Sequence, residues 1–193
     1  MILGILGLQG DFYAHKKMGE KLGIETIIVR SPEDFEKIDG LIIPGGESTT
    51  ITKLLSRYNL IKSLKKFHKE GKPIFGTCAG MILLAKKIDN HPDQFSFGFI
   101  DISVKRNAYG RQIESFEEDV SIPIIGKNPF RTVFIRAPKI SRMGKSVESL
   151  AKHNSDHILA REGNILVGSF HPELTEDTRI YEYFLEMVKR TKP

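Results

Sequence analysis

The sequence is poor in cysteine and lacks tryptophan: among 193 residues it has one cysteine, Cys78, and no tryptophan. A single cysteine cannot form a disulfide within the chain, so this thiol is either buried packing or a candidate nucleophile. Long hydrophobic runs are also lacking. The apolar stretch 1–8 is too short to span a membrane, and it has neither the basic region nor the cleavage site of a signal peptide. We therefore expect a soluble, cytoplasmic protein without a membrane partner.

Charge of one sign is not concentrated anywhere. The 29 Lys and Arg residues exceed the 24 Asp and Glu residues by only five, and they are spread along the chain. Four lysines lie at helical spacing and are expected to form the solvated face of a helix: Lys62, Lys65, Lys66 and Lys69. Because nucleic-acid binders usually show a basic stripe with interleaved aromatic residues, we expect no nucleic-acid partner.

The first half of the chain alternates short apolar runs with helical patterns. Buried strands are expected at 2–8, 24–29, 40–43 and 73–76. Four helices are expected from the apolar stripes Ala14, Met18 and Leu22; Ile51, Leu54, Leu55 and Tyr58; Leu60, Ile61, Leu64 and Phe67; and Met81, Leu84, Ala85 and Ile88. Strands that alternate with helices of this length predict an α/β fold with a parallel sheet covered on both faces.

The second half changes character. Short β-like runs between 95 and 135, separated by Gly, Pro and Asn residues, predict an antiparallel extension of the sheet. Further strands are expected at 147–151, 158–161 and 165–170, and a last helix carries the stripe Ile180, Phe184, Met187 and Val188, with Asp177 or Thr175 near its start. No repeat or linker is visible, so we expect a single domain over 1–193, which is large enough to fold without a disulfide or metal.

The strongest local motif is Gly76-Thr-Cys-Ala-Gly80, which follows an expected strand and precedes an expected helix. This is the elbow motif in which a nucleophile sits between two glycines, here with Cys78 in that position. The tight turn strains the backbone and requires small residues on both sides. The helix N-terminus favours a thiolate, and the Ala79 N–H is aimed at a forming oxyanion. A lone cysteine is more often a small buried hydrophobe, but this context favours the nucleophile.

A second motif is Gly168-Ser-Phe-His-Pro-Glu173. We expect a strand to deliver His171 and Pro172 to keep the chain extended, so that Glu173 at i+2 points the same way and orients the imidazole. Taken alone, such a histidine is more often structural; together with the elbow it supplies the base for a thiol. None of the other histidines has such a carboxylate at fixed extended spacing after a buried strand: His15, His68, His91, His153 and His157.

A third motif, Pro44-Gly-Gly-Glu-Ser-Thr-Thr50, lies between an expected strand and helix. It lacks the Gly-Lys-Ser/Thr ending of a phosphate-binding P-loop. It is either a glycine-rich turn with a helix cap, or a loop whose N–H groups at the sheet edge supply a second oxyanion donor. In the second case, Glu47 is placed to meet a substrate ammonium.

With these motifs in hand, the chain resembles class I (triad) glutamine amidotransferases. Within them it is similar to the glutaminase subunits of pyridoxal 5'-phosphate synthase. The elbow and His-Pro-Glu are shared across the class, whereas two segments are particular to this branch: 106–112 (Arg-Asn-Ala-Tyr-Gly-Arg-Gln) and 135–138 (Ile-Arg-Ala-Pro). The segments 7–11, 41–50, 134–138 and 170–174 also match. Segment 90–97 fits least well, which puts only a surface loop in doubt.

The resemblance implies a Rossmann-like three-layer sandwich with a mostly parallel central sheet and an antiparallel extension. It implies that Cys78 attacks the amide of L-glutamine to give a thioester and ammonia, while His171 moves protons and Glu173 orients it. By residue-by-residue transfer, the residues that bind glutamine are Gly46, Glu47, Ser48, Arg106, Ile135 and Arg136, and those of the oxyanion hole are Gly46 and Ala79. Neither a metal nor a cofactor is needed for this hydrolysis.

The resemblance also implies a partner. Ammonia would pass to a (β/α)8-barrel pyridoxal 5'-phosphate synthase subunit in a large hetero-oligomer, which joins it to a pentose phosphate and a triose phosphate. Segment 7–11 is expected to contribute to the surface that meets this subunit. Because a Gly-Gly peptide can flip and complete the oxyanion hole only on assembly, we expect weak activity from the isolated subunit.

Three alternatives remain at this stage. Another glutaminase subunit, such as that of imidazole glycerol phosphate synthase, would share the triad but lack segment 106–112. A stress or protease-like protein with a cysteine elbow would lack the glutamine-binding loop and the Glu at i+2. A catalytically silent binding subunit would not need the intact triad.

Overall fold

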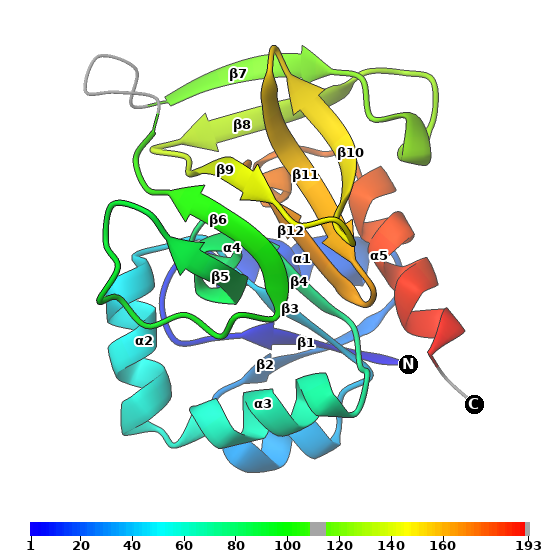
Figure 1. The fold of residues 1–193 in the computed structure, drawn as a ribbon. Helices are drawn as coiled ribbons and strands as arrows, with labels where there is room; N and C mark the ends of the chain where they lie inside the picture. Colours follow the sequence, from blue (N-terminus) through cyan, green and yellow to red (C-terminus); the bar gives the residue numbers. More distant parts are fainter. Residues whose placement is uncertain (109–114, 192–193) are drawn as a thin grey trace.

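A seven-stranded sheet forms the centre of the fold (Figure 1). The computed structural model describes residues 1–108 and 115–191. The strands lie in the order β10-β11-β12-β4-β3-β1-β2. Their bounds are β1 (Ile2–Leu6), β2 (Glu25–Val29), β3 (Gly40–Ile43), β4 (Ile74–Thr77), β10 (Glu148–His153), β11 (Asp156–Glu162) and β12 (Ile165–Gly168). The five strands from β12 to β2 pair in parallel, and β11 and β10 continue the sheet in antiparallel fashion.

Helices cover both faces of this sheet. They are α1 (Phe12–Lys21), α2 (Ser48–Arg57), α3 (Leu60–Lys69), α4 (Ala79–Leu84) and α5 (Arg179–Arg190). Successive side chains of a strand point to opposite faces, and β3 shows the consequence: Ile42 packs in one core with Met18 of α1 and Phe184 of α5, while Leu41 packs in the other with Leu64 of α3. The predicted three-layer α/β sandwich is confirmed.

The helix after the elbow is shorter than its stripe predicts. α4 ends at Leu84, and Ala85 and Ile88 belong to a strand, β5 (Ala85–Ile88). The reason lies far along the chain: the backbone N–H groups of Phe97 and Phe99 donate to the carbonyls of Leu83 and Leu84 at 2.7 and 2.9 Å. Because these carbonyls already accept hydrogen bonds from outside the helix, they are not used by a further helical turn. The helical expectation for Ala85 and Ile88 was wrong.

The middle of the chain forms two separate small sheets and does not extend the central one. One has the order β5-β6-β9 and the other pairs β7 with β8. Figure 1 shows β7 and β8 at the top of the view, where the tips of β10 and β11 also reach. The strands are β6 (Ile100–Lys105), β7 (Ser115–Val120), β8 (Phe130–Ile135) and β9 (Lys139–Met143). The antiparallel extension exists, but later strands make it: β10 and β11, with β11 joined to β12 by a turn after Glu162.

Details of the stripes are mostly confirmed. Ile180, Phe184, Met187 and Val188 of α5 are all buried, and α5 begins after Thr178. Tyr58 departs from its stripe: it follows α2 and is 48% exposed. The four lysines of α3 are exposed, as expected. Three 3-10 helices complete the described elements: η1 (Pro32–Glu36), η2 (Pro123–Ile125) and η3 (Pro172–Leu174). None of the helices in 1–108 and 115–191 is long and apolar enough to cross a bilayer.

The carboxyl ends of the parallel strands position the site. Three neighbouring strands, β3, β4 and β12, end at the same edge of the sheet. Each is followed by one predicted motif: β3 by the glycine loop, β4 by Cys78 and β12 by His171. In open α/β sheets, ligands bind outside this edge, so the topology alone brings the three motifs together.

Candidate active site

The elbow has the geometry that its glycines predict. Cys78 adopts φ 48° and ψ −102°, a conformation that side chains with a Cβ rarely take. A Cβ on Gly76 would stand 2.7 Å from the carbonyl oxygen of Gly80, and a Cβ on Gly80 would overlap with the carbonyl of Ile43. Strand and helix therefore touch through backbone, and the strained turn holds the sulfur at the edge of the sheet.

The thiol is largely buried and lies beside the end of β8. Cys78 is 7% exposed, and its Sγ donates a long hydrogen bond to the carbonyl of Ile135 at 3.9 Å. Its backbone N–H donates to Gly168 at the end of β12, at 2.8 Å. The nucleophile candidate is thus tied to the strand that leads to His171.

His171 and Glu173 are in direct contact. His171 Nδ1 donates to Glu173 Oε1 at 2.7 Å, and both side chains are almost completely buried. The contact was predicted, but the local backbone was not: Pro172 and Glu173 belong to η3 instead of an extended strand. The 3-10 turn folds the carboxylate back onto the ring. The backbone N–H of His171 also donates to Val133 of β8 at 2.8 Å, which fixes the start of this turn.

The contact between His171 and Glu173 shifts the pKa of both side chains. Burial lowers the pKa of His171, but the nearby Cys78 sulfur and the Glu173 carboxylate outweigh it and raise that pKa to about 10. Burial raises the pKa of Glu173, while His15 and the hydrogen bond from His171 act against it and leave a lowered pKa. The carboxylate therefore stays ionised and favours an imidazolium at neutral pH.

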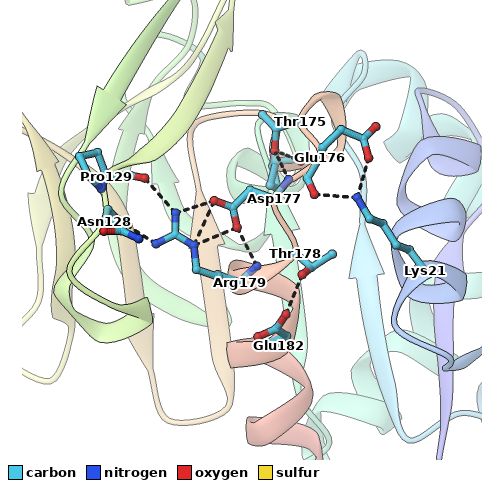
Figure 2. Close-up of polar contacts among 10 residues, drawn as sticks. Lys21, Asn128, Pro129, Thr175, Glu176, Asp177, Thr178, Arg179 and Glu182 are labelled. Atoms are coloured by element: carbon cyan, nitrogen blue, oxygen red, sulfur yellow. Dashed lines mark hydrogen bonds and ion pairs between the residues drawn. The ribbon is translucent and has the colours of Figure 1, made fainter.

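The chain after Glu173 is anchored by ion pairs on both sides, as Figure 2 shows. Arg179, at the start of α5, binds the Asp177 carboxylate and donates to the carbonyls of Asn128 and Pro129 at 2.8 and 2.9 Å. On the other side, Lys21 of α1 pairs with Glu176 at 2.5 Å. These contacts hold the segment after η3 between α1, α5 and the segment before β8.

A cavity of about 220 Å³ opens beside the thiol. Its lining includes the predicted Cys78, His171, Gly46, Glu47, Ser48, Arg106, Ile135 and Arg136, and three further residues, Gln9, Ile82 and Asn107. Ala79 and Glu173 do not line it. Tyr109 to Gln112, the rest of the segment quoted with Arg106, lie outside the described residues. The structure thus places the candidate nucleophile, the candidate base and the residues expected to bind glutamine around one small cavity.

Two opposite charges in this cavity are paired with each other. Arg106 Nη2 donates to Glu47 Oε1 at 2.9 Å, and Arg106 is mostly buried whereas Glu47 is half exposed. Arg136 is exposed and has φ 44°. The cavity thus offers a carboxylate and a guanidinium side by side.

Gln94 connects these residues and was missed by the sequence. Its Oε1 accepts from Arg106 at 2.5 Å, and its Nε2 donates to Ser48 Oγ at 2.9 Å. Asn90 holds the Arg106 backbone through both of its amide atoms, at 3.1 and 3.2 Å. Segment 90–97 fitted the family resemblance least well and was expected to be a surface loop only. No signal in the sequence points to Gln94, because its contacts join segments far apart along the chain.

The glycine loop is held by the loop that follows β1. Gln9 Oε1 accepts from the Glu47 backbone N–H at 2.7 Å, and a Cβ on Gly10 would overlap with the carbonyl of Gly45. Gly46 has φ 148°, within the range that favours glycine. Segment 7–11 was expected at a partner surface; the structure also makes it the support of the glycine loop.

A second histidine lies behind the triad. His15 of α1 is fully buried; its Nδ1 is 2.8 Å from the Tyr181 hydroxyl, and its Nε2 is 3.3 Å from both Thr77 Oγ1 and Glu173 Oε2. Sequence reasoning set His15 aside because no carboxylate follows it at close spacing. In the part of the chain that the structure describes, no group of three or more His, Cys, Asp or Glu side chains is arranged to hold a metal ion.

Known proteins match this chain over nearly its full length. The model of the SNO glutamine amidotransferase family matches residues 5–190. Proteins named pyridoxal 5'-phosphate synthase subunit PdxT are similar: that of Thermotoga petrophila is 55% identical over 98% of this chain and 100% of its own, and that of Thermosipho africanus is 55% identical over the same shares.

Solved structures agree. A glutamine amidotransferase crystal structure superposes with a TM-score of 0.93 at 48% identity, covering 98% of this chain and all of that one. A putative GMP synthase protein of Thermoplasma acidophilum has a TM-score of 0.71 at 20% identity, covering 98% of this chain and 94% of its own, which shows a shared fold.

Proposed function

Because the chain belongs to the SNO glutamine amidotransferase family, we propose that it is the glutaminase subunit of a pyridoxal 5'-phosphate synthase. It hydrolyses the side-chain amide of L-glutamine to L-glutamate and ammonia, and the ammonia serves the biosynthesis of pyridoxal 5'-phosphate, a vitamin B6. One observation carries the proposal. Cys78 and His171, a nucleophile and a base, line the same cavity as Glu47 and Arg106, a pair of opposite charges.

Cys78, His171 and Glu173 are the proposed catalytic triad. His171 Nε2 takes the thiol proton before Sγ bonds to the amide carbon, and its raised pKa lets the imidazole hold that proton at neutral pH. It then gives that proton to the amide nitrogen, the carbon–nitrogen bond breaks, and ammonia leaves a thioester on Cys78. Water attacks the thioester carbon, His171 takes a water proton, and this proton returns to the sulfur as glutamate departs. Glu173 holds the ring through Nδ1 and stabilises its cation.

The thiol is close enough to the imidazole to raise its pKa, but it is not aligned with Nε2 for proton transfer. Its Sγ contacts the Ile135 carbonyl, and His171 Nε2 has no hydrogen-bond partner among the described residues. Because proton transfer requires Sγ and Nε2 to be aligned, glutamine binding or docking of a partner completes this alignment. The free subunit is therefore expected to be weakly active.

The oxyanion of the tetrahedral intermediate is assigned to two backbone N–H groups, those of Ala79 and Gly46. Ala79 follows the nucleophile at the start of α4, and Gly46 lies in the loop that lines the cavity. Preorganised N–H donors of this kind lower the barrier by stabilising charge that develops only in the transition state. A flip of a peptide in the Gly45-Gly46 loop would complete the arrangement on assembly.

Glutamine recognition follows from the charge pair. The substrate is a zwitterion. When it binds, its carboxylate pairs with Arg106 and its ammonium pairs with Glu47, and these two contacts replace the Arg106–Glu47 ion pair. A guanidinium binds a carboxylate in bidentate fashion, and Arg136 offers a second one at the cavity. Gly46, Ser48 and Ile135 complete the proposed binding set, with backbone and hydroxyl groups along the rim.

The proposed partner is a (β/α)8-barrel synthase subunit in a large hetero-oligomer. Segment 7–11 is assigned to the contact surface. Beside it lies a groove whose apolar lining includes Leu8, Phe12 and Tyr58, and Tyr13 nearby is 59% exposed. Gln9 and Gly10 touch the glycine loop directly, so a partner that contacts them also acts on that loop.

We further infer that residues 1–193 form one amidotransferase domain, which the family match over 5–190 supports. The reaction is assigned to the cytoplasm, because the proposed substrates are a free amino acid and sugar phosphates, which are metabolites of that compartment.

The test is to mix the chain with candidate synthase subunits and to measure glutamate release with and without each. A strong rise in turnover with the pyridoxal 5'-phosphate synthase subunit is expected. A rise only with the cyclase subunit of imidazole glycerol phosphate synthase would favour that alternative, and no glutamate release with any partner would refute a glutaminase.

A further inference from the structure

A fully buried polar cluster lies behind the triad, outside the cavity. His15 of α1, Thr77 of β4 and Tyr181 of α5 each have an exposed fraction of 0%. None of the three lines the cavity, so none of them can touch glutamine. Buried polar groups are costly unless they are satisfied by partners, and this cluster brings together three different elements at one carboxylate.

The contacts define the protonation of His15. Burial lowers the pKa of His15, so the imidazole carries one proton, and burial raises the pKa of Tyr181 well above its ordinary value, so the phenol keeps its proton. If Nδ1 donated to Tyr181, the hydroxyl proton would need another acceptor, and the bare Nε2 would face the Glu173 carboxylate. The favourable arrangement is Tyr181 O–H donating to Nδ1, which leaves the proton on Nε2.

That proton points to the second oxygen of the triad carboxylate. Glu173 uses Oε1 to accept from His171 at 2.7 Å. Its Oε2 is buried and has no hydrogen bond of good geometry among the described residues, and His15 Nε2 lies 3.3 Å away. Nε2 is equally distant from Thr77 Oγ1, in the residue just before the nucleophile.

We propose that His15, held by Tyr181, is a positioning residue that fixes Glu173 through Oε2 so that Oε1 faces His171. This rests on the proposed glutaminase function and extends the chain of contacts from Cys78 to α1 and α5. Without His15, the carboxylate can rotate about its last bond and its charge loses a neighbouring N–H.

The charged groups around His15 determine in which direction its removal changes the pKa of Glu173. Glu173 and Asp11 favour its cation, while His171 on η3 opposes it; Thr77 and Tyr181 are neutral. The same proximity lowers the pKa of Glu173. Removing His15 therefore raises the pKa of Glu173, and the acid limb of kcat/KM moves to higher pH.

The experiment is done on the complex with the synthase partner and compares four variants. His15→Leu removes the ring, and His15→Gln restores an N–H donor near the Nε2 position. Tyr181→Phe removes the hydroxyl that fixes the His15 tautomer. Met18→Ala is the matched control, because Met18 is buried on the same helix and packs in the core away from the cavity. Glutamate release is measured from pH 5 to 9, with kcat and KM determined separately.

For His15→Leu we expect kcat to fall about tenfold with KM within about twofold, since a hydrogen bond to a charged group is lost while the binding cavity is intact. Its acid limb is expected to move up by roughly 0.5 to 1 pH unit. His15→Gln recovers most of kcat, Tyr181→Phe falls in between, and Met18→Ala keeps the wild-type kcat and pH profile. Unchanged kcat and acid limb in His15→Leu would overturn the proposal.

Two further outcomes are decisive. If His15→Leu does not fold, Tyr181→Phe with a wild-type kcat and acid limb refutes the role of the cluster, and a shifted acid limb supports it. If Met18→Ala shows the same shift as His15→Leu, the effect is one of packing and the proposal is wrong. Failure of the proposed function is distinct, because then the wild-type complex releases no glutamate at all.

Discussion

Gly45 packs against both His171 and Cys78: a Cβ added to it would overlap with His171 Cε1 and stand 3.4 Å from Cys78 Cβ. The residue is part of the Pro44-Gly45-Gly46 loop, and the absence of its side chain lets base and thiol approach each other. Gly45 was not among the predicted site residues, yet the triad depends on it.

Gly45→Ala is expected to lower kcat for glutamine hydrolysis at least 100-fold, because a displacement of the base by about 1 Å costs this much. Steady-state assays of glutamate release in the complex with the synthase partner measure it. Gly163→Ala is the control: it has open space and φ 54°, so it should cost about 1 kcal/mol of stability and leave kcat unchanged. A Gly45→Ala enzyme with wild-type kcat would contradict the geometry.

Cys78→Ala is expected to abolish glutamine hydrolysis while leaving complex formation intact, because the thiol is the only proposed nucleophile. Glutamate release and analytical ultracentrifugation with the synthase partner measure both properties. Undiminished glutaminase activity in the variant would end the triad proposal.

Cys78→Gly should be more stable than Cys78→Ala by about 1 kcal/mol, since glycine adopts φ 48° and ψ −102° without the strain of a Cβ. Denaturant unfolding of the two inactive variants measures the difference, with equal catalytic defects as the internal control. Equal free energies of unfolding would mean that the elbow stores no strain at Cys78.

His171 should titrate near pH 10, and Cys78→Ala should lower this pKa because the sulfur is one of the groups that raise it. A raised pKa means that protonation stabilises the folded state. The contribution is full below about pH 6.5 and is lost as the pH rises through 10. NMR titration of the imidazole measures the pKa, and unfolding at several pH values measures the stability. A wild-type pKa near 6.5 would contradict the prediction.

Gln94→Ala should raise KM for glutamine about tenfold with little change in kcat, because Arg106 and Ser48 lose their shared partner but the triad is untouched. Asp93→Ala, at an exposed neighbouring position, is the control and should leave both constants unchanged. A large fall in kcat with constant KM would show that Gln94 acts on the chemistry instead.

Motifs that are short along the chain were predictable, because their geometry is local. The elbow, the strand before it and the His171–Glu173 contact needed only spacing, although η3 produces that contact by a turn instead of an extended segment. The fold class followed from alternating patterns. What could not be predicted depends on tertiary contacts: Phe97 and Phe99 end α4 early, and Gln94 meets Arg106 and Ser48 across loops.

His15 shows the same limit more sharply. Its partners Thr77, Glu173 and Tyr181 come from three other elements, and no spacing in the sequence announces them. The role of His15 is indicated by the buried Glu173 carboxylate, in which only Oε1 accepts a hydrogen bond from the described residues. This arrangement exists only in the folded protein.

The neighbours β4 and β12 have a consequence for synthesis of the chain. They pair side by side and lead to the proposed nucleophile and base, yet β5 to β11 lie between them along the sequence. As the ribosome extends the protein, Cys78 emerges long before His171, and β4 has an open edge until β12 arrives. Such non-local pairing is slow and is completed late. A nascent or truncated chain therefore carries the proposed nucleophile without the proposed base, so we expect it not to hydrolyse glutamine.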